Sequence, residues 1–271
     1  MFAKQPIESL RAGKHFSASA LKSFLTCPWK FKLQYVDAAV PENRPSALVL
    51  GKAVHEALAV HHHAVKDGRT ILPEEIVGRF DAAFDAHLPG EVPLQFKNGD
   101  DADKLRTTGR RLVEVYLKEA QLGRVVAVEQ PFHADLVDPR TGEILEPRLV
   151  GVFDLIEADD DGNLIVAEVK TAARRWSAGQ VDLDLQGSLY AEAIAQAGLV
   201  ADGQEALIRY DVLVKNKTAV LDRQYAVRRP GDREMARMIA VDSLKAIEAG
   251  SFYRNPGWQC DGCPFRKRCG I

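Results

Sequence analysis

The chain of 271 residues lacks the features that mark several classes of protein. It has no run of about 18 apolar residues, so we expect no membrane span. The first residues, MFAKQPIESLRAGKHF, contain no apolar stretch like that of a secretory signal, so we expect a cytoplasmic protein. The formal net charge is only −2. A nucleic-acid partner would therefore have to be bound by a local basic patch rather than by net attraction.

Two nucleotide-binding motifs are also absent. The chain contains no GxxxxGK[ST] phosphate loop, because the GKA at 51–53 lacks both the upstream glycine and the following hydroxyl residue. It contains no GxGxxG that would indicate a dinucleotide-binding fold. If a helicase or a recombination or adaptation partner works with this protein, that partner is another chain.

Cysteine is scarce, and its spacing is uneven. Cys27 stands alone, whereas Cys260, Cys263 and Cys269 lie within ten residues of one another. A reducing cytosol disfavours disulfides, so the four cysteines indicate a ligand set. Zinc and an iron–sulfur cluster both use four thiolates. The spacing leaves both open, because structural zinc is common but usually has two CxxC pairs, and this chain has one pair and two single cysteines.

The residues that are present predict helices first and then a sheet. Hydrophobic residues make up 46% of the chain, which is enough for a packed interior. A serine-capped helix ends at Cys27, another contains Phe31 and Tyr35, and further helices are expected at 46–67, 73–87 and 101–121. Strands are expected at 125–136, 148–158, 164–171, 206–215 and 219–227, with helices near 181–198 and 230–249.

This order of elements predicts a single α/β or α+β domain spanning 1–271, in which helices flank a mixed central sheet. We divide it into a helical region at 1–124, a sheet core at 125–228 and a helix with a cysteine-rich tail at 229–271. In the helix at 46–67, the expected core contacts are Leu48, Ala53, Leu58 and Val60.

Two acidic residues stand inside apolar strands. Asp154 interrupts LVGVFDLI, and Glu168 and Lys170 end the run LIVAEVK and share one face of their strand. With the turn centred on Asp161, Asp154 and Glu168 lie seven residues to either side and would face each other, with Cβ atoms about 5 Å apart. Opposed like charges need a cation between them. Either a structural ion pair with Lys170 or a bridging divalent metal ion would meet that need.

At these residues the chain resembles the PD-(D/E)xK nuclease superfamily, in its RecB-like branch. The matching segments are GVFDLIEADDDGNLIVAEVKT and the following QGSLY. The resemblance implies a restriction-endonuclease-like fold and a metal-dependent DNA nuclease. It implies that Asp154 and Glu168 are metal ligands, with Val169 also at the metal, and that Lys170 orients or activates water. It further implies Gln186 and Tyr190 as active-site supports, one helical turn apart.

A histidine in GKAVHEAL, His55, matches the histidine by which nucleases of this branch complete the metal site. The neighbouring His61, His62 and His63 cannot all reach one ion, and we expect them to be a solvated helix end. The chemistry implied is phosphodiester hydrolysis by a metal-activated water. Carboxylates with one histidine suit Mg²⁺ or Mn²⁺.

The N-terminal segment SASALKSFLTCPWKFKLQYV resembles RecB-like nucleases that carry a 4Fe–4S cluster, including the AddB nuclease domain and the CRISPR-associated adaptation exonuclease. Their cysteines show the same one-plus-three arrangement. The resemblance implies a structural cluster held by Cys27, Cys260, Cys263 and Cys269, which joins the two ends of the chain. Trp29 and Trp258 are expected to shield it.

Arg174, Arg175 and Trp176 follow Lys170 closely and are the best candidates for DNA contact, through charge and stacking, although Trp176 could equally anchor its loop on the core. We expect an exonuclease that acts on single-stranded DNA or DNA ends in recombination, repair, CRISPR adaptation or phage DNA processing. The alternative is a catalytically silent iron–sulfur subunit that binds DNA or assists assembly.

Overall fold

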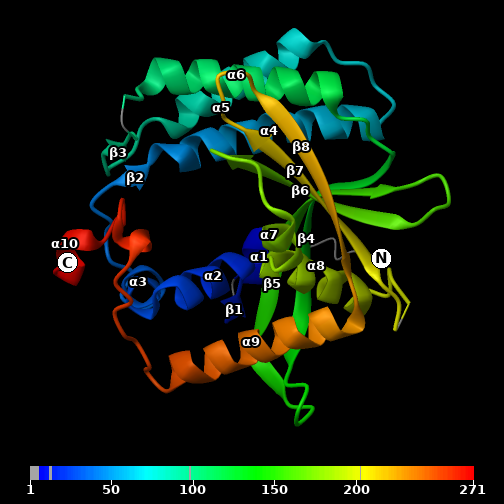
Figure 1. Cartoon of the computed structure of the whole chain (residues 1–271). Helices are drawn as coiled ribbons and strands as arrows, with labels where there is room; N and C mark the ends of the chain where they lie inside the picture. Colours follow the sequence, from blue (N-terminus) through cyan, green and yellow to red (C-terminus); the bar gives the residue numbers. More distant parts are fainter. Residues whose placement is uncertain (1–5, 12–13, 98, 202) are drawn as a thin grey trace.

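The computed structural model describes residues 6–11, 14–97, 99–201 and 203–271, and Figure 1 shows a central sheet with helices on both sides. This confirms the expected mixed α/β architecture. The six strands of the sheet are β1 (His15–Phe16), β4 (Arg124–Val137), β5 (Ile144–Ala158), β6 (Leu164–Ala172), β7 (Ala206–Val214) and β8 (Val220–Arg228). Two short strands, β2 (Arg44–Pro45) and β3 (Leu94–Gln95), form a separate parallel pair.

Both hairpin and crossover connections build the sheet. The strand order is β1-β5-β6-β7-β8, and β4 pairs with β5 outside this path. β5 and β6 are antiparallel and joined by a tight turn in which Gly162 has a φ of 87°, a conformation that glycine adopts without a steric penalty. β6 and β7 are parallel, so the chain must cross over between them. The crossover contains α7 (Ala178–Asp182) and α8 (Leu185–Gln196).

One face of the sheet is covered by three long helices. These are α4 (Ser46–Lys66), α5 (Pro73–His87) and α6 (Ala102–Glu119). Leu50, Phe80 and Leu112 bring them together in a core that also includes Val169 of β6 and Leu213 of β7. The alternation of side chains along β6 and β7 therefore sends part of each strand toward this helical layer.

The opposite face packs against α2 (Ala18–Thr26), α8 and α9 (Pro230–Glu248). The main core lies here and includes Phe24 of α2, Ile194 of α8 and Val241 of α9. As expected, a serine begins α2, because the Ser17 hydroxyl accepts a hydrogen bond of 3.1 Å from the backbone N–H of Ala20.

The helix α3 (Pro28–Phe31) and the C-terminal tail meet at one end of the molecule (Figure 1). The remaining elements are α1 (Ile7–Arg11), the π-helical turn η1 (Lys32–Val36), the 3₁₀ turn η2 (Trp258–Cys260) and α10 (Arg266–Cys269). The backbone N–H of Trp29 donates to the carbonyl of Tyr253, and that of Glu42 donates to the carbonyl of Pro264. The segment 28–42 therefore lies beside the C-terminal tail.

Three sequence-based expectations are wrong. Leu48 is 60% exposed, although Ala53 and Leu58 of the same helix are buried as expected. His62 is only 2% exposed, because α6 covers this part of α4. Trp258 is 87% exposed and therefore does not shield the cysteines.

Among the described residues, no helix is both long and apolar enough to cross a membrane, as expected.

Candidate active site

The site begins with a gap in the strand pairing of β5. β4 pairs along the length of β5 and therefore takes up one edge of that strand. The other edge is shared by β1, which ends opposite Leu149, and by β6, which pairs from Leu155 onward. Residues 150–154 have no strand partner on this edge in the described parts of the chain. Asp154 is the last residue of this strand gap.

The pairing of β5 with β6 has the expected register but ends early. Leu155 pairs with Ala167, so the same register would place Asp154 opposite Glu168. The ladder stops before that pair. Instead, the Asp154 carboxylate accepts a hydrogen bond of 2.9 Å from the backbone N–H of Val169. The Asp154 side chain therefore lies between β5 and β6, which no longer pair at this point. Glu168 lies next to Val169, so the two acids are close to each other where the strands separate.

Glu168 and Lys170 are held by two residues of α8. The Lys170 ammonium donates to Glu168 Oε1 at 2.5 Å and to Gln186 Oε1 at 2.9 Å. The Gln186 amide donates to Glu168 Oε1 at 2.8 Å and to the Tyr190 hydroxyl at 2.7 Å. That hydroxyl donates to the carbonyl of Val152, inside the strand gap, at 2.9 Å. The structure thus brings the predicted catalytic residues into one connected set.

One carboxylate oxygen of this set has no hydrogen-bond donor among the described residues. Glu168 Oε2 is buried, yet no hydrogen-bond donor reaches it from the residues that the structure describes. Burial and the nearby Asp154 raise the pKa of Glu168. For Asp154, burial is outweighed by His55, Lys170 and the Val169 N–H, which lower its pKa. The two acids therefore differ in proton affinity, and a divalent cation at the unpartnered oxygen would stabilise both as carboxylates.

His55 reaches this site from α4. Its Nδ1 lies 3.4 Å from Asp154 Oδ2, and the side chain is 29% exposed. Burial disfavours the imidazolium, but the Asp154 carboxylate outweighs it and raises the pKa of His55 to about 9. The imidazolium therefore occupies the place beside Asp154 that a cation would take. A metal ion binds neutral imidazole, so its binding would release this proton.

A third carboxylate, Glu129, was not predicted from the sequence. It lies on β4 between Val128 and Gln130, whose partners on β5 flank Asp154. Its φ of 45° is rare for a residue with a side chain, and such strain is often found at functional positions. Glu129 is exposed, but partial loss of hydration and the nearby Asp154 raise its pKa to about 7.

Glu129, His55 and Asp154 form a group with the donor set of a metal site. Each offers one ligand atom, and the three atoms lie within 4.8 Å of one another. In the sequence, the only indication that Glu129 has a functional role is its position as an acidic residue inside a β-rich segment. A register shift between Ala134 and Leu136 lies between Glu129 and the β4–β5 turn, so its partner cannot be derived by counting residues from that turn.

A groove opens onto this group from the helical layer. It is lined by Leu48, Lys52, His55 and His87 from the helices and by Glu129 and Lys170 from the sheet. The exposed Leu48, which we expected in the core, thus lies on the wall of the groove. The groove combines acidic ligands, a lysine and an apolar wall beside the strand gap.

The three predicted DNA contacts lie in the segment after β6. Arg174 and Arg175 are exposed, and Arg175 forms a 2.9 Å ion pair with Asp222. The Trp176 ring is partly buried against the main core, with its centroid 5.3 Å from that of Tyr210. Its backbone carbonyl also accepts a hydrogen bond from Gln224. These contacts match the loop-anchor alternative for Trp176.

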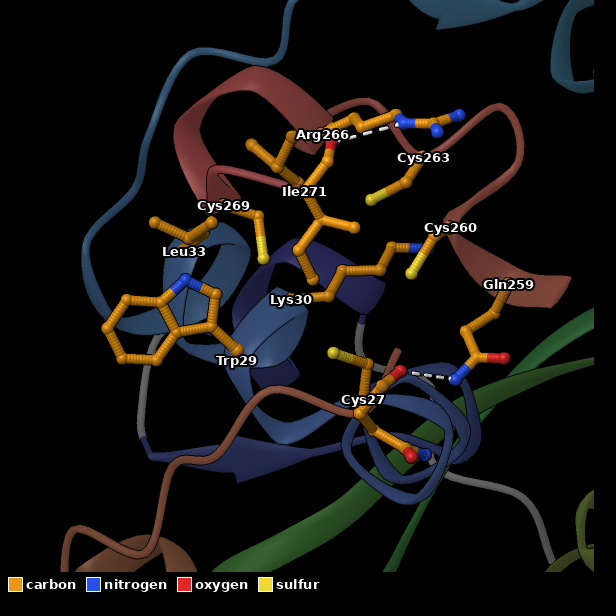
Figure 2. Close-up of a pocket in the computed structure, with 12 residues that line it drawn as sticks. Cys27, Trp29, Lys30, Leu33, Gln259, Cys260, Cys263, Arg266, Cys269 and Ile271 are labelled. Atoms are coloured by element: carbon orange, nitrogen blue, oxygen red, sulfur yellow. Dashed lines mark hydrogen bonds between the residues drawn. The ribbon is translucent and has the colours of Figure 1, made fainter. Parts of the chain in front are cut away.

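The four cysteines line a second pocket, at the end of the molecule where α3 meets the C-terminal tail. Figure 2 shows the side chains of Cys27, Cys260, Cys263 and Cys269 directed into it. All four are free thiols. Burial raises the pKa of the Cys263 thiol. Besides the cysteines, the pocket is lined by Trp29, Lys30, Leu33, Asn255, Gln259, Phe265, Arg266 and Ile271.

Comparison with known proteins identifies the superfamily of the chain. The crystal structure of a protein from Eubacterium rectale, provisionally named an exonuclease, is 11% identical and has a TM-score of 0.50, with 95% of this chain and 89% of that chain covered. The crystal structure of SSO0001 is 15% identical, with a TM-score of 0.37 and coverages of 89% and 93%. No curated protein matches the chain. The family model of the PD-(D/E)XK nuclease superfamily matches residues 15–270, and the chain therefore belongs to this superfamily.

Proposed function

We propose that this protein is a DNA exonuclease of the RecB-like branch that depends on Mg²⁺ or Mn²⁺. The observation that carries the proposal is the strand gap, where Asp154 and the unpartnered oxygen of Glu168 meet beside Lys170. Buried like charges are unfavourable unless a cation lies between them, and phosphodiester hydrolysis uses such a cation.

His55, Asp154 and Glu168 would hold the metal ion, and the backbone of Val169 would lie against it. When bound, a divalent ion lowers the pKa of a coordinated water and neutralises the charge that develops on the phosphate. Glu129 would add a fourth protein ligand, since its carboxylate belongs to the same group as His55 and Asp154. Carboxylate oxygens with one imidazole match the preference of Mg²⁺ and Mn²⁺.

Lys170 would act as a cation rather than as a base. Burial favours its neutral form, but Glu168 and Asp154 outweigh that effect and raise its pKa. A protonated ammonium cannot accept a proton from water. It can orient the attacking water and stabilise a phosphate oxygen, and Gln186 fixes its direction through the 2.9 Å hydrogen bond.

DNA would enter along the groove above these groups. Arg174 and Arg175 follow β6 directly and would contact the phosphate backbone, while the packing of Trp176 on the core fixes their loop. Exonuclease action is proposed because the Eubacterium rectale protein carries that name and shares the fold. Recombination, repair, CRISPR adaptation and phage DNA processing all require the trimming of single strands or ends.

The test is product analysis on end-labelled single- and double-stranded DNA with Mg²⁺ or Mn²⁺. We expect stepwise shortening from one end, and no products in EDTA. Lys170→Ala should abolish the products, whereas Lys66→Ala, at the end of α4, should not. Products of unchanged yield from Lys170→Ala would contradict the catalytic assignment. Binding of DNA without any cleavage would favour the alternative of a catalytically silent subunit.

We also propose that the four cysteines hold a structural 4Fe–4S cluster. Four free thiols that line one pocket supply the ligand set of such a cluster. Lys30 and Arg266 line the same pocket, where they would offset the negative charge of thiolate ligands. The cluster would join α3 to the C-terminal tail and so close the chain into a large loop.

Protein purified without oxygen should be brown, absorb near 400 nm and contain about four iron atoms per chain. Cys263→Ser should remove the colour and lower the melting temperature. Stoichiometric zinc without iron in the same preparation would contradict the cluster and favour the other ligand set that the spacing allows.

A further inference from the structure

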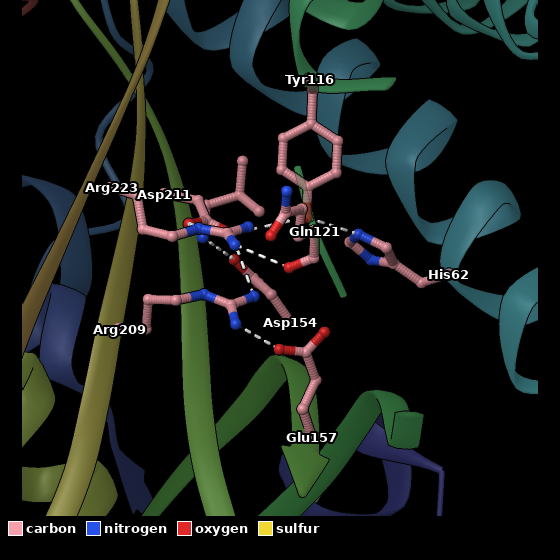
Figure 3. Close-up of polar contacts among 9 residues, drawn as sticks. His62, Tyr116, Gln121, Asp154, Glu157, Arg209, Asp211 and Arg223 are labelled. Atoms are coloured by element: carbon pink, nitrogen blue, oxygen red, sulfur yellow. Dashed lines mark hydrogen bonds and ion pairs between the residues drawn. The ribbon is translucent and has the colours of Figure 1, made fainter. Parts of the chain in front are cut away.

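A second group of buried charges lies between the sheet and the helical layer, as Figure 3 shows. Arg209 of β7 forms ion pairs with Glu157 of β5 and, at 3.1 Å, with Asp211 of its own strand. Asp211 also accepts hydrogen bonds of 2.7 and 3.2 Å from Arg223 of β8. These four residues, together with Tyr116 of α6 and His62 of α4, are called the buried ion network below.

Tyr116 and His62 connect the charges to the helices. The Tyr116 hydroxyl donates to Asp211 Oδ2 at 3.5 Å, and His62 Nε2 lies 2.8 Å from the same hydroxyl. A hydroxyl that donates to the carboxylate can accept from the imidazole, so His62 carries its proton on Nε2. Burial lowers the pKa of His62 to about 3, so the imidazole is neutral at ordinary pH.

Stability alone does not account for such a network. Glu157, Arg209 and Asp211 are each at most 2% exposed, and burying charges costs several kcal/mol per ion before their attraction is counted. Glu157 Oε1 and Arg209 Nε also lack hydrogen-bond partners within the described part of the chain. Apolar side chains of similar volume would be about as stable. What the ions and hydrogen bonds add is a fixed geometry between elements.

The network contacts two of the elements that carry candidate metal ligands, α4 and β5. His62 lies seven residues after His55, so the two histidines project from the same side of α4. Glu157 lies three residues after Asp154 on β5. A chain of contacts therefore runs from α4 through Tyr116, Asp211 and Arg209 to β5.

We infer that Tyr116 and His62 are positioning residues, which hold α4 at the depth where His55 meets Asp154. This inference rests on the proposed metal site. Neither side chain would touch the metal ion or the DNA. Their effect is on the separation of His55 from Asp154, now 3.4 Å between Nδ1 and Oδ2. Residues that hydrogen-bond directly to a metal ligand typically change metal affinity by about 10- to 100-fold when replaced, and we expect residues that act through α4 to reach the lower end of that range.

The test measures Mn²⁺ affinity by calorimetry on the full chain without DNA, together with the melting temperature. Tyr116→Phe and His62→Leu should each weaken Mn²⁺ binding about tenfold or more. His62→Gln should largely restore it, because its amide can donate from a position near Nε2. A matched control is Asp138→Asn, since Asp138 is a buried carboxylate paired with Arg140 and Lys245 beyond the end of β4. It should lower the melting temperature and leave Mn²⁺ affinity unchanged.

Each outcome separates this inference from the metal site itself. Unchanged affinity in both Tyr116→Phe and His62→Leu, with normal binding by the unmodified chain, would overturn the inference alone. Losses of affinity that follow the melting temperature in all variants, Asp138→Asn included, would also overturn it, because they would reflect general destabilisation. No Mn²⁺ binding by the unmodified chain would overturn the proposed metal site and this inference with it.

Discussion

The strand gap and the buried ion network lie on the same sheet and differ in how their charges balance. The network sets two acids, Glu157 and Asp211, against two arginines, and its members bond to one another. The candidate site around the strand gap contains three carboxylates, those of Glu129, Asp154 and Glu168. Its cations are Lys170, which is permanently charged, and the titratable His55. The buried ion network is neutral without a ligand, whereas the candidate site has more carboxylates than cations. Balanced buried charges indicate structure, and this shortage indicates a cation site.

The comparison predicts opposite effects of removing an acid from each group. Asp154→Asn should reduce nuclease activity by a factor on the order of 10³, because a ligand and a charge that act on the transition state are lost. Glu168→Gln should reduce activity similarly, and its metal-free melting temperature should stay equal or rise, because burial and the nearby Asp154 disfavour the charge of Glu168. Activity assays with paired thermal melts would test this, and a clear loss of metal-free stability in Glu168→Gln would contradict the proposed shortage of positive charge.

In the buried ion network, removing an acid should instead lower the stability of the fold. Asp211→Leu would leave Arg209 and Arg223 without their shared partner, and breaking a buried pair in this way costs about 3–5 kcal/mol. Denaturant titration should show a correspondingly lower free energy of unfolding. A change below about 1 kcal/mol would mean that water or rearrangement compensates the arginines, and the contrast between the two groups would then fail.

The strand gap should also make metal-free stability depend on pH. The pKa of Glu129 is raised to about 7, so its stabilising proton is fully bound below about 4.5 and lost as pH rises through 7. The pKa of His55 is raised to about 9, so its contribution is present below about 6.5 and lost as pH rises through 9. The melting temperature should therefore fall from pH 5 to pH 9.

Single variants would assign the two pH windows. Glu129→Gln should flatten the fall between about pH 4.5 and 7, and His55→Gln the fall between about 6.5 and 9. Calorimetry of the metal-free protein in a series of buffers is the measurement. Added Mn²⁺ should oppose the fall at high pH, because it takes the place of the lost protons. An identical profile in both variants and the unmodified chain would show that other groups cause it.

The smallest effect is expected outside both groups. Arg174→Ala should weaken binding to single-stranded DNA only a few-fold, as expected for one phosphate contact, and reduce the slope of log affinity against log salt by about 0.7. Arg79→Ala on the exposed side of α5 is the control. Equal salt slopes for Arg174→Ala and the unmodified chain would remove Arg174 from the DNA contact.

Much of the fold and part of the site could be predicted because the signals are local. The turn around Gly162 determines how β5 meets β6, so the approach of Asp154 and Glu168 followed from counting residues. Glu129 could not be found in this way, because a register shift between Ala134 and Leu136 separates it from its turn. His62 looked solvent-exposed within a run of three histidines, yet it is buried by Tyr116, which lies 54 residues away in the sequence. Contacts of that kind depend on the packing of whole helices.

The most direct test of the central claim is a crystal structure of the protein grown with Mn²⁺, with anomalous scattering recorded at the manganese edge. The account predicts an anomalous peak in the strand gap, within coordination distance of His55, Asp154 and Glu168, and the loss of that peak in Asp154→Asn. A gap without manganese in well-ordered crystals, with Lys170 still bonded to Glu168, would contradict it.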